Sequence, residues 1–181
     1  MLYITGQFPN TIYQSLLERI RDVGKIYHIR IGRVPARGNR SLAALVVLWD
    51  LTVTRRLVLQ TDDTLLDEDS FKAEVEVLPR WFQMPVPTIT SQSRVIHITG
   101  NHHIVNEDFI LRLLCETFQF DLDRAVEIVL GGEASRLEVY FANYAYQAEW
   151  AYHKLTTDPH VAGRFTTVFA PDPCDIVKGD S

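Results

Sequence analysis

The sequence carries one short segment twice. Residues 2–7 read LYITGQ and residues 96–101 read IHITGN, so Gly6 and Gly100 lie 94 residues apart. Internal similarity at the length of a small α+β domain indicates a duplicated domain. The length of 181 residues allows either one domain or two. The repeated segment therefore predicts two related domains.

The composition is that of an ordinary globular protein, with 46% hydrophobic and 23% charged residues. The longest apolar run, Leu42 to Trp49, is too short to cross a bilayer, and the N-terminus lacks the pattern of a secretory signal. We therefore expect an intracellular protein, nuclear or cytoplasmic, without a membrane partner. Two cysteines, Cys115 and Cys174, fit neither a disulfide framework nor a zinc site.

The net charge of −5 conceals two halves of opposite charge. Residues 1–60 carry nine Lys and Arg against three Asp and Glu, a balance of +6, whereas residues 82–181 carry seven against thirteen, a balance of −6. A basic half is the expected electrostatic footprint of nucleic-acid binding. The acidic half opposes such binding, so we expect the two halves to have different partners.

Hydrophobic periodicity gives each half the same order of elements, βαββαβ. In the first half we expect strands at 2–5, 26–31, 42–49 and 73–78, and helices at 11–23 and 50–60. In the second we expect strands at 94–99, 125–130, 137–142 and 165–169, and helices at 106–118 and 145–155. The first of these helices is expected to be capped by Asn106 and to carry Phe118 on its buried stripe, and the second to turn Ala151 and Leu155 inward. The domains then span 1–80 and 94–172, joined by a Pro-containing linker at 81–93 and followed by a tail at 173–181.

One strand of the second half allows two registers. With Phe141 facing inward, Leu137 and Val139 also enter the core, and Glu138 and Tyr140 lie with Arg136 on the outer face. A slip of one residue, which the spacing to Ala148 favours, would exchange the two faces. The core-forming alternation favours the first register.

This pattern resembles a tandem pair of RNA recognition motifs. The resemblance implies an α+β fold of two ferredoxin-like sandwiches, each a four-stranded antiparallel sheet backed by two helices. Residues 2–7 fit the family's first signature, and residues 96–101 fit it with His97 in place of the aromatic residue. The signature of the third strand is degenerate, because Ala43 and Leu45 stand where two base-stacking aromatics belong.

In the first domain a single ring and a set of arginines point to RNA. Each base stacked on an aromatic ring contributes roughly 1–3 kcal/mol, so losing two of three rings weakens sheet-face binding about a thousandfold or more. The second strand and the following loop carry arginines with no acidic residue between Lys25 and Trp49, which favours phosphate contact over a solvated loop. Glu74 and Glu76 share one strand face and would repel phosphate if that face is open. The candidate RNA-binding residues are Tyr3, His28, Arg30, Arg33, Arg37 and Arg40.

The second domain is expected to bind protein instead. Carboxylates on its open sheet face would repel an anionic ligand. Trp150 lies on a helix whose inward stripe is already filled, which makes its ring available as an interface anchor, with core packing as the alternative. The candidate protein-interaction residues are His97, Glu127, Glu138, Tyr140 and Trp150, of which Glu127 and Glu138 are expected on the open sheet face beside His97 and Tyr140.

No motif predicts catalysis, a cofactor or a metal. His102 and His103 are adjacent, so we expect their side chains to diverge, and the sequence has neither a nucleophile elbow nor a phosphate-cradling loop. We expect a non-catalytic module whose first domain contacts single-stranded RNA and whose second binds a protein or a second copy. The alternative is an assembly module of a larger RNA-processing or RNA-silencing protein that binds no RNA.

Overall fold

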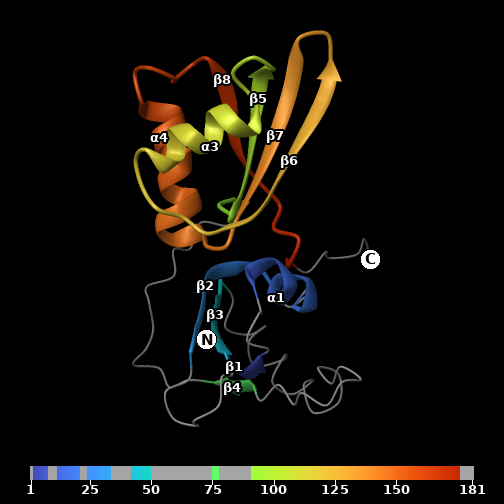
Figure 1. Ribbon diagram of the computed structural model, residues 1–181, viewed down its shortest axis with the longest axis vertical. Helices are drawn as coiled ribbons and strands as arrows, with labels where there is room; N and C mark the ends of the chain where they lie inside the picture. The colour runs from blue at the N-terminus through green and yellow to red at the C-terminus, as the bar shows by residue number, and fades with distance from the viewer. Residues whose placement is uncertain are drawn as a thin grey trace. The chain divides into compact units, whose positions relative to one another are not determined.

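The computed structural model describes residues 2–7, 12–20, 24–33, 42–49, 75–77 and 91–175. The chain divides into two compact units, residues 1–88 with 173–181 and residues 89–172. Each unit contains a four-stranded antiparallel sheet, as Figure 1 shows for each unit separately. The α+β class expected from the sequence is confirmed.

The sheet of the first unit has the strand order β2-β3-β1-β4. Its elements are β1 (Leu2–Gln7), α1 (Tyr13–Arg19), β2 (Ile26–Arg33), β3 (Leu42–Leu48) and β4 (Val75–Val77). Leu16 and Leu17 of α1 are buried, as are Ala44 and Val46 on one face of β3. The helix expected at 50–60 lies outside the described residues.

The second sheet has the order β6-β7-β5-β8, which repeats the first: second, third, first and fourth strand of the unit. Its strands are β5 (Val95–Asn101), β6 (Leu122–Gly131), β7 (Ala134–Phe141) and β8 (Phe165–Ala170). Its helical elements are α3 (Glu107–Cys115), η2 (Tyr144–Ala148) and α4 (Glu149–Thr157). The two sheets therefore share one topology, in agreement with the predicted duplication.

Helix α3 begins and packs as expected. The side chain of Asn106 caps it, because its Oδ1 accepts a hydrogen bond from the Phe109 N–H at 2.9 Å. Ile110 and Leu114 are fully buried. The helix ends at Cys115, however, so Phe118 follows the helix and is only partly buried rather than lying on its buried stripe.

The helix predicted from residue 145 begins later, at Glu149. Tyr146 has φ +64° and ψ −3°, a left-handed conformation that an α-helix cannot contain. Together with Ala145, at φ −60° and ψ 128°, it forms the central pair of a type II turn. Beyond the turn, Ala151 and Leu155 are buried as predicted.

Strand β7 adopts the first of the two registers. Leu137, Val139 and Phe141 are completely buried, whereas Glu138 and Tyr140 keep partial exposure. The alternative register is therefore wrong. Since β7 pairs with both β5 and β6, its register also decides which residues of those strands share a face.

Candidate nucleic-acid and protein interfaces

In the first unit, one row across the sheet contains two of the candidate RNA-binding residues. Tyr3 of β1 pairs with Leu45 of β3, and Leu45 pairs in turn with Arg30 of β2. On its other side Tyr3 pairs with Glu76 of β4. With strands about 4.8 Å apart, the backbones of Arg30 and Tyr3 lie roughly 10 Å from each other. The row runs Arg30, Leu45, Tyr3, Glu76.

The other candidates of this set lie on or beyond β2. His28 is partly buried and Arg30 is exposed. Arg33 pairs with Leu42, so it belongs to β2 and not to the loop in which the sequence placed it. Arg37 and Arg40 lie outside the described residues.

The ring of His28 is held in its neutral form. Burial, and secondarily the charge of Arg30, lower the pKa of His28 below its ordinary 6.5. Its Nδ1 is buried without a hydrogen-bond partner in the part of the chain that the structure describes. At neutral pH His28 can therefore stack or accept a hydrogen bond, but it does not supply a positive charge.

Strand β3 carries no aromatic side chain. Ala43, which pairs with Gly32, is 5% exposed, and Leu45 is partly buried. These are the two positions at which the sequence resemblance led us to expect base-stacking rings. The degenerate third-strand pattern therefore leaves an aliphatic middle to this sheet, flanked by Arg30.

In the second unit, the open face of the sheet holds a closed polar network around Glu138. Tyr140 Oη donates to Glu138 Oε2 at 2.8 Å, and His97 Nε2 lies 3.4 Å from Glu138 Oε1. Arg136 Nη1 lies 3.8 Å from the same oxygen, and the guanidinium of Arg124 covers the Tyr140 ring at 4.3 Å. The charged groups of this face thus bind one another. Their mutual pairing leaves few polar groups for a ligand.

The pKa values of His97 and Tyr140 on this face are shifted in directions that keep both side chains uncharged at neutral pH. Burial lowers the pKa of His97, although the charge of Glu138 acts against it. Burial, with the hydrogen bond to Glu138, raises the pKa of Tyr140 above 10.0. At neutral pH the face therefore carries a neutral imidazole and a neutral phenol beside one carboxylate.

The prediction that Glu127 shares this face with Glu138 is wrong. Glu127 pairs with Leu137, so it lies on the opposite face, and Val126 takes the position across from Glu138. Figure 1 shows the β6–β7 hairpin extending past α3. Val129, near the hairpin end, is 78% exposed. Side chains there reach solvent on both faces of the sheet. The alternation of apolar and polar residues therefore cannot predict which side chains lie on the open face.

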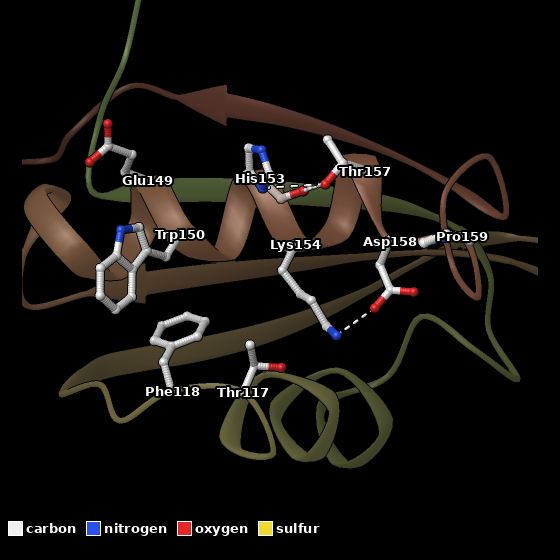
Figure 2. Close-up of a pocket in the computed structure, with 9 residues that line it drawn as sticks. All are labelled: Thr117, Phe118, Glu149, Trp150, His153, Lys154, Thr157, Asp158 and Pro159. Carbon is white, nitrogen blue, oxygen red and sulfur yellow. Dashed lines mark hydrogen bonds and ion pairs between the residues drawn. The ribbon is translucent and has the colours of Figure 1, made fainter.

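Trp150 lies in the helical layer, on the opposite side of the sheet from the Glu138 network. Its ring is 49% exposed and makes edge contacts with Phe118, at 5.9 Å between ring centroids, and with Tyr146, at 5.7 Å. Phe118 and Trp150 border a hollow of about 790 Å³ between α4 and the segment after α3, which is also lined by His153 and Lys154. Figure 2 shows Phe118 and Trp150 pointing toward one another across it. We call this hollow the Trp150 groove.

The five residues predicted to contact protein therefore occupy separate surfaces. His97, Glu138 and Tyr140 share the open sheet face, Glu127 lies behind it, and Trp150 borders the groove. Sequence reasoning missed Phe118 and Tyr146 as partners of Trp150. The missing signal was the early end of α3 and the late start of α4, since a helix continued through either residue would have buried or displaced these rings.

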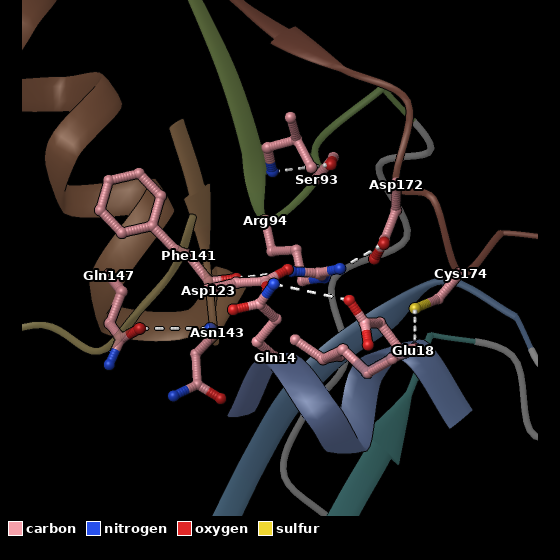
Figure 3. Close-up of polar contacts among 12 residues, drawn as sticks. Gln14, Glu18, Ser93, Arg94, Asp123, Phe141, Asn143, Gln147, Asp172 and Cys174 are labelled. Atoms are coloured by element: carbon pink, nitrogen blue, oxygen red, sulfur yellow. Dashed lines mark hydrogen bonds and ion pairs between the residues drawn. The ribbon is translucent and has the colours of Figure 1, made fainter. Parts of the chain in front are cut away.

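A buried ion cluster, which the sequence did not predict, joins three strand ends. Arg94, 1% exposed, donates from Nε to Asp172 at 3.1 Å, from Nη1 to Asp123 at 3.1 Å, and from Nη1 to the Phe141 carbonyl at 2.8 Å. Figure 3 shows Arg94 between these partners. Arg94 precedes β5, Asp172 follows β8 and Asp123 lies at the start of β6, so the cluster ties together the strands at one end of the sheet.

Within the described ranges, no three or more His, Cys, Asp and Glu residues lie so as to hold a metal ion. The rings of His102 and His103 do not diverge as expected, since their centroids are 4.0 Å apart. Cys115 is exposed, whereas Cys174 is buried with its Sγ 3.8 Å from the Leu17 carbonyl oxygen. No helix in the described part of the chain is long and apolar enough to span a membrane.

Neither a protein-family model nor a curated protein sequence matches the chain. Solved structures do match. RNA recognition domains 1 and 2 of Sex-lethal from Drosophila melanogaster align at 15% identity and a TM-score of 0.35, over 93% of this chain and 98% of that one. The first two RRM domains of the yeast poly(U)-binding protein Pub1 align at 16% identity and 0.33, over 94% and 99%.

The N-terminal three RNA-binding domains of the yeast splicing factor Prp24 align at 16% identity and a TM-score of 0.34. The match covers 94% of this chain and 66% of the Prp24 chain, so this chain spans a little under two thirds of that structure. At these identities and TM-scores the likeness identifies no family.

Proposed function

We propose that the protein is a non-catalytic RNA-binding module, in which the first unit contacts single-stranded RNA and the second binds protein. The observation that carries the proposal is the row of the first sheet in which Tyr3 and the exposed Arg30 stand two strands apart. An aromatic residue on a central strand, with an arginine two strands away in the same row, offers a base a stacking surface and a nearby phosphate a counter-charge.

The charge of the surrounding sequence supports this assignment. Arg30 and Arg33 both lie on β2, and Arg37 and Arg40 follow within seven residues in a stretch with no Asp or Glu from Lys25 to Trp49. Phosphate contacts of this kind supply affinity without sequence selectivity. The neutral ring of His28 adds a contact that does not depend on salt. We assign the RNA-binding role to Tyr3, His28, Arg30, Arg33, Arg37 and Arg40.

A salt-dependent titration tests the proposal. Labelled single-stranded RNA is titrated against the unmodified protein and against the triple variant Arg33→Ala, Arg37→Ala, Arg40→Ala at two salt concentrations. Because each phosphate contact on a single strand contributes about 0.7 to the slope of log K against log salt, we expect the triple variant to lose about 2 from that slope. Arg112→Ala, which removes an exposed arginine from α3, is the matched control and should leave the slope unchanged.

Two results contradict RNA binding on this surface: no binding by the unmodified protein at low salt, or equal slopes for the triple variant and the protein. Tyr3→Ala separates stacking from charge. It should weaken binding by roughly 1–3 kcal/mol without changing the salt slope.

The rival function, an assembly module without RNA binding, is favoured by one observation. Glu76 pairs directly with Tyr3, and Leu45 on the other side offers no ring, so the one aromatic position lies between a carboxylate-bearing residue and an aliphatic one. If the titration detects no RNA binding, this second function becomes the better explanation of both units.

A further inference from the structure

We propose that the second unit binds a peptide segment of another protein in the Trp150 groove, through an aromatic anchor residue flanked by Lys or Arg. This inference rests on the proposed function, in which the second unit is the protein-binding half. It adds the surface and the chemistry of the partner.

The open sheet face and the helix face of the second unit differ in the groups that remain available to a partner. On the open sheet face, Glu138 already engages Tyr140, His97 and Arg136, so a ligand there has to break existing contacts. On the helix face, Tyr146 and Trp150 are 56% and 49% exposed, and they contact each other. Aromatic side chains of this kind dominate the energetics of protein interfaces, because they bury a large area at little cost in conformational entropy. The helix face is therefore the surface that gains more from a protein partner.

The backbone at Tyr146 points to the same surface. Its φ of +64° is the left-handed conformation of a type II turn, in which Gly or Asn is the usual residue at this position. The ring of Tyr146 fills no core position, since more than half of it is exposed. Non-glycine residues in this region are strained, and such strain clusters at binding sites. The Tyr146 ring contacts the Trp150 ring, which borders the groove.

The hollow is large enough to take an aromatic side chain together with part of the segment that carries it. Its volume of about 790 Å³ falls within the 300–1,000 Å³ of typical small-ligand sites. Trp150, His153 and Thr157 of α4 form one wall, and Thr117 and Phe118 from the segment after α3 form the other. A second hollow of about 550 Å³, which includes Phe120, opens on the other side of Phe118. An extended peptide crossing Phe118 can therefore place one residue on each side of the ring.

The charges around the two hollows select a cationic partner. Lys154 is the only Lys or Arg among the residues that line them, and it is engaged in an ion pair with Asp158. Two further carboxylates, Glu149 and Asp121, remain at the edges. Glu149 forms no ion pair among the described residues. This arrangement attracts Lys or Arg beside the anchor and repels the phosphates of RNA.

The test uses the full chain and three fluorescein-labelled peptides in a glycine–serine background. The first has a central tryptophan flanked by arginines, the second has alanine in place of the tryptophan, and the third has glutamates in place of the arginines. Binding is measured by fluorescence polarisation. The tryptophan–arginine peptide should bind most tightly, the glutamate peptide less tightly, and the alanine peptide most weakly, with at least a tenfold loss relative to the first. Trp150→Ala should weaken the first peptide about tenfold or more, in the range of an interface hot spot.

Glu149→Lys reports on charge alone and should weaken the arginine peptide several-fold at low salt while favouring the glutamate peptide. The matched control is Val168→Ala, which removes an apolar side chain, 48% exposed, from the open sheet face and should change affinity less than twofold. Circular dichroism checks that each variant is folded.

Four outcomes overturn the proposal. They are no binding of the first peptide at millimolar protein, equal binding by Trp150→Ala, an equal loss from Val168→Ala, and a dimer in light scattering that Trp150→Ala abolishes, which would make a second copy the occupant. The RNA titration is run on the same samples, and competition of RNA with the peptide is a fifth outcome that contradicts the assignment. If the peptide binds but RNA does not, the groove stands and only the RNA function fails.

Discussion

At Gly100 the backbone of β5 passes so close to its neighbours that a side chain would be in unusually tight contact with them. A Cβ at this position would lie 3.0 Å from Phe165 Cβ and 3.1 Å from Val105 Cγ2. The next residue, Asn101, closes the strand end, since its Oδ1 accepts from the His103 N–H at 2.9 Å and its Nδ2 donates to Glu133 at 3.0 Å. In the second copy of the repeated segment, Gly100 thus allows close backbone packing and Asn101 forms the hydrogen bonds that end the strand.

Gly100→Ala should destabilise the protein by about 1–3 kcal/mol, the usual cost of inserting a methyl group into a filled site. Gly32→Ala is the matched control, because Gly32 also lies in a strand but has nothing within 4 Å of its Cβ position. There we expect no loss and a gain of up to about 1 kcal/mol from the stiffer unfolded chain. Urea unfolding of both variants measures the difference, and equal midpoints would contradict the role given to Gly100.

At the scale of elements, the alternating pattern correctly predicts which side chains of the central strand β7 are buried, but it fails in the exposed part of β6. Leu137, Val139 and Phe141 pack under helices that cover β7, so burial enforces the register that the pattern indicated. Glu127 lies in a part of β6 where solvent reaches both faces, and the same kind of pattern failed there. Strand and helix interiors were thus predictable, because burial acts on them directly.

The network that joins β5 and β7 predicts how stability depends on pH. The pKa of His97 in the folded protein is lower than the 6.5 of the free side chain, so between these values the unfolded chain binds more protons. Stability is therefore complete above pH 6.5 and falls as the pH decreases through this range. His97→Gln removes this proton uptake and should flatten the decrease of the urea midpoint between pH 7.5 and 5.5.

Part of the slope should persist in that variant, because the lowered pKa of His28 acts with the same sign in the first unit. The double variant His28→Gln, His97→Gln should be flatter than either single one. An unchanged slope in all three would show that these rings are as free to bind protons in the folded protein as in the unfolded chain.

At the scale of the whole chain, the buried cluster of Arg94 joins residues that are distant in sequence. Asp123 lies 29 positions and Asp172 lies 78 positions from Arg94. The side chains of both aspartates are almost completely buried, at 6% and 0% exposure. Their charges therefore depend on a guanidinium that the fold brings between them.

Arg94→Met should destabilise the protein by about 3–5 kcal/mol, because it leaves two buried carboxylates without this cation while keeping most of the side-chain volume. Arg112→Met changes an exposed arginine in the same way and should cost less than about 0.5 kcal/mol. Urea unfolding followed by circular dichroism compares the two. Similar midpoints would indicate that the burial of Asp123 and Asp172 does not depend on the Arg94 guanidinium.

The sequence by itself determined the duplicated strand order, the α+β class, the Asn106 cap and the opposite charges of the two halves. These follow from local patterns: hydrophobic period, capping residues and composition act within a few positions of one another. Only the tertiary structure decided that Glu127 and Glu138 lie on opposite faces, that Arg94 lies between Asp123 and Asp172, and that Phe118 and Trp150 border one groove with Tyr146 against the Trp150 ring. Each depends on where helices end and which strands neighbour each other. Those are set by packing between distant segments, which no local pattern records.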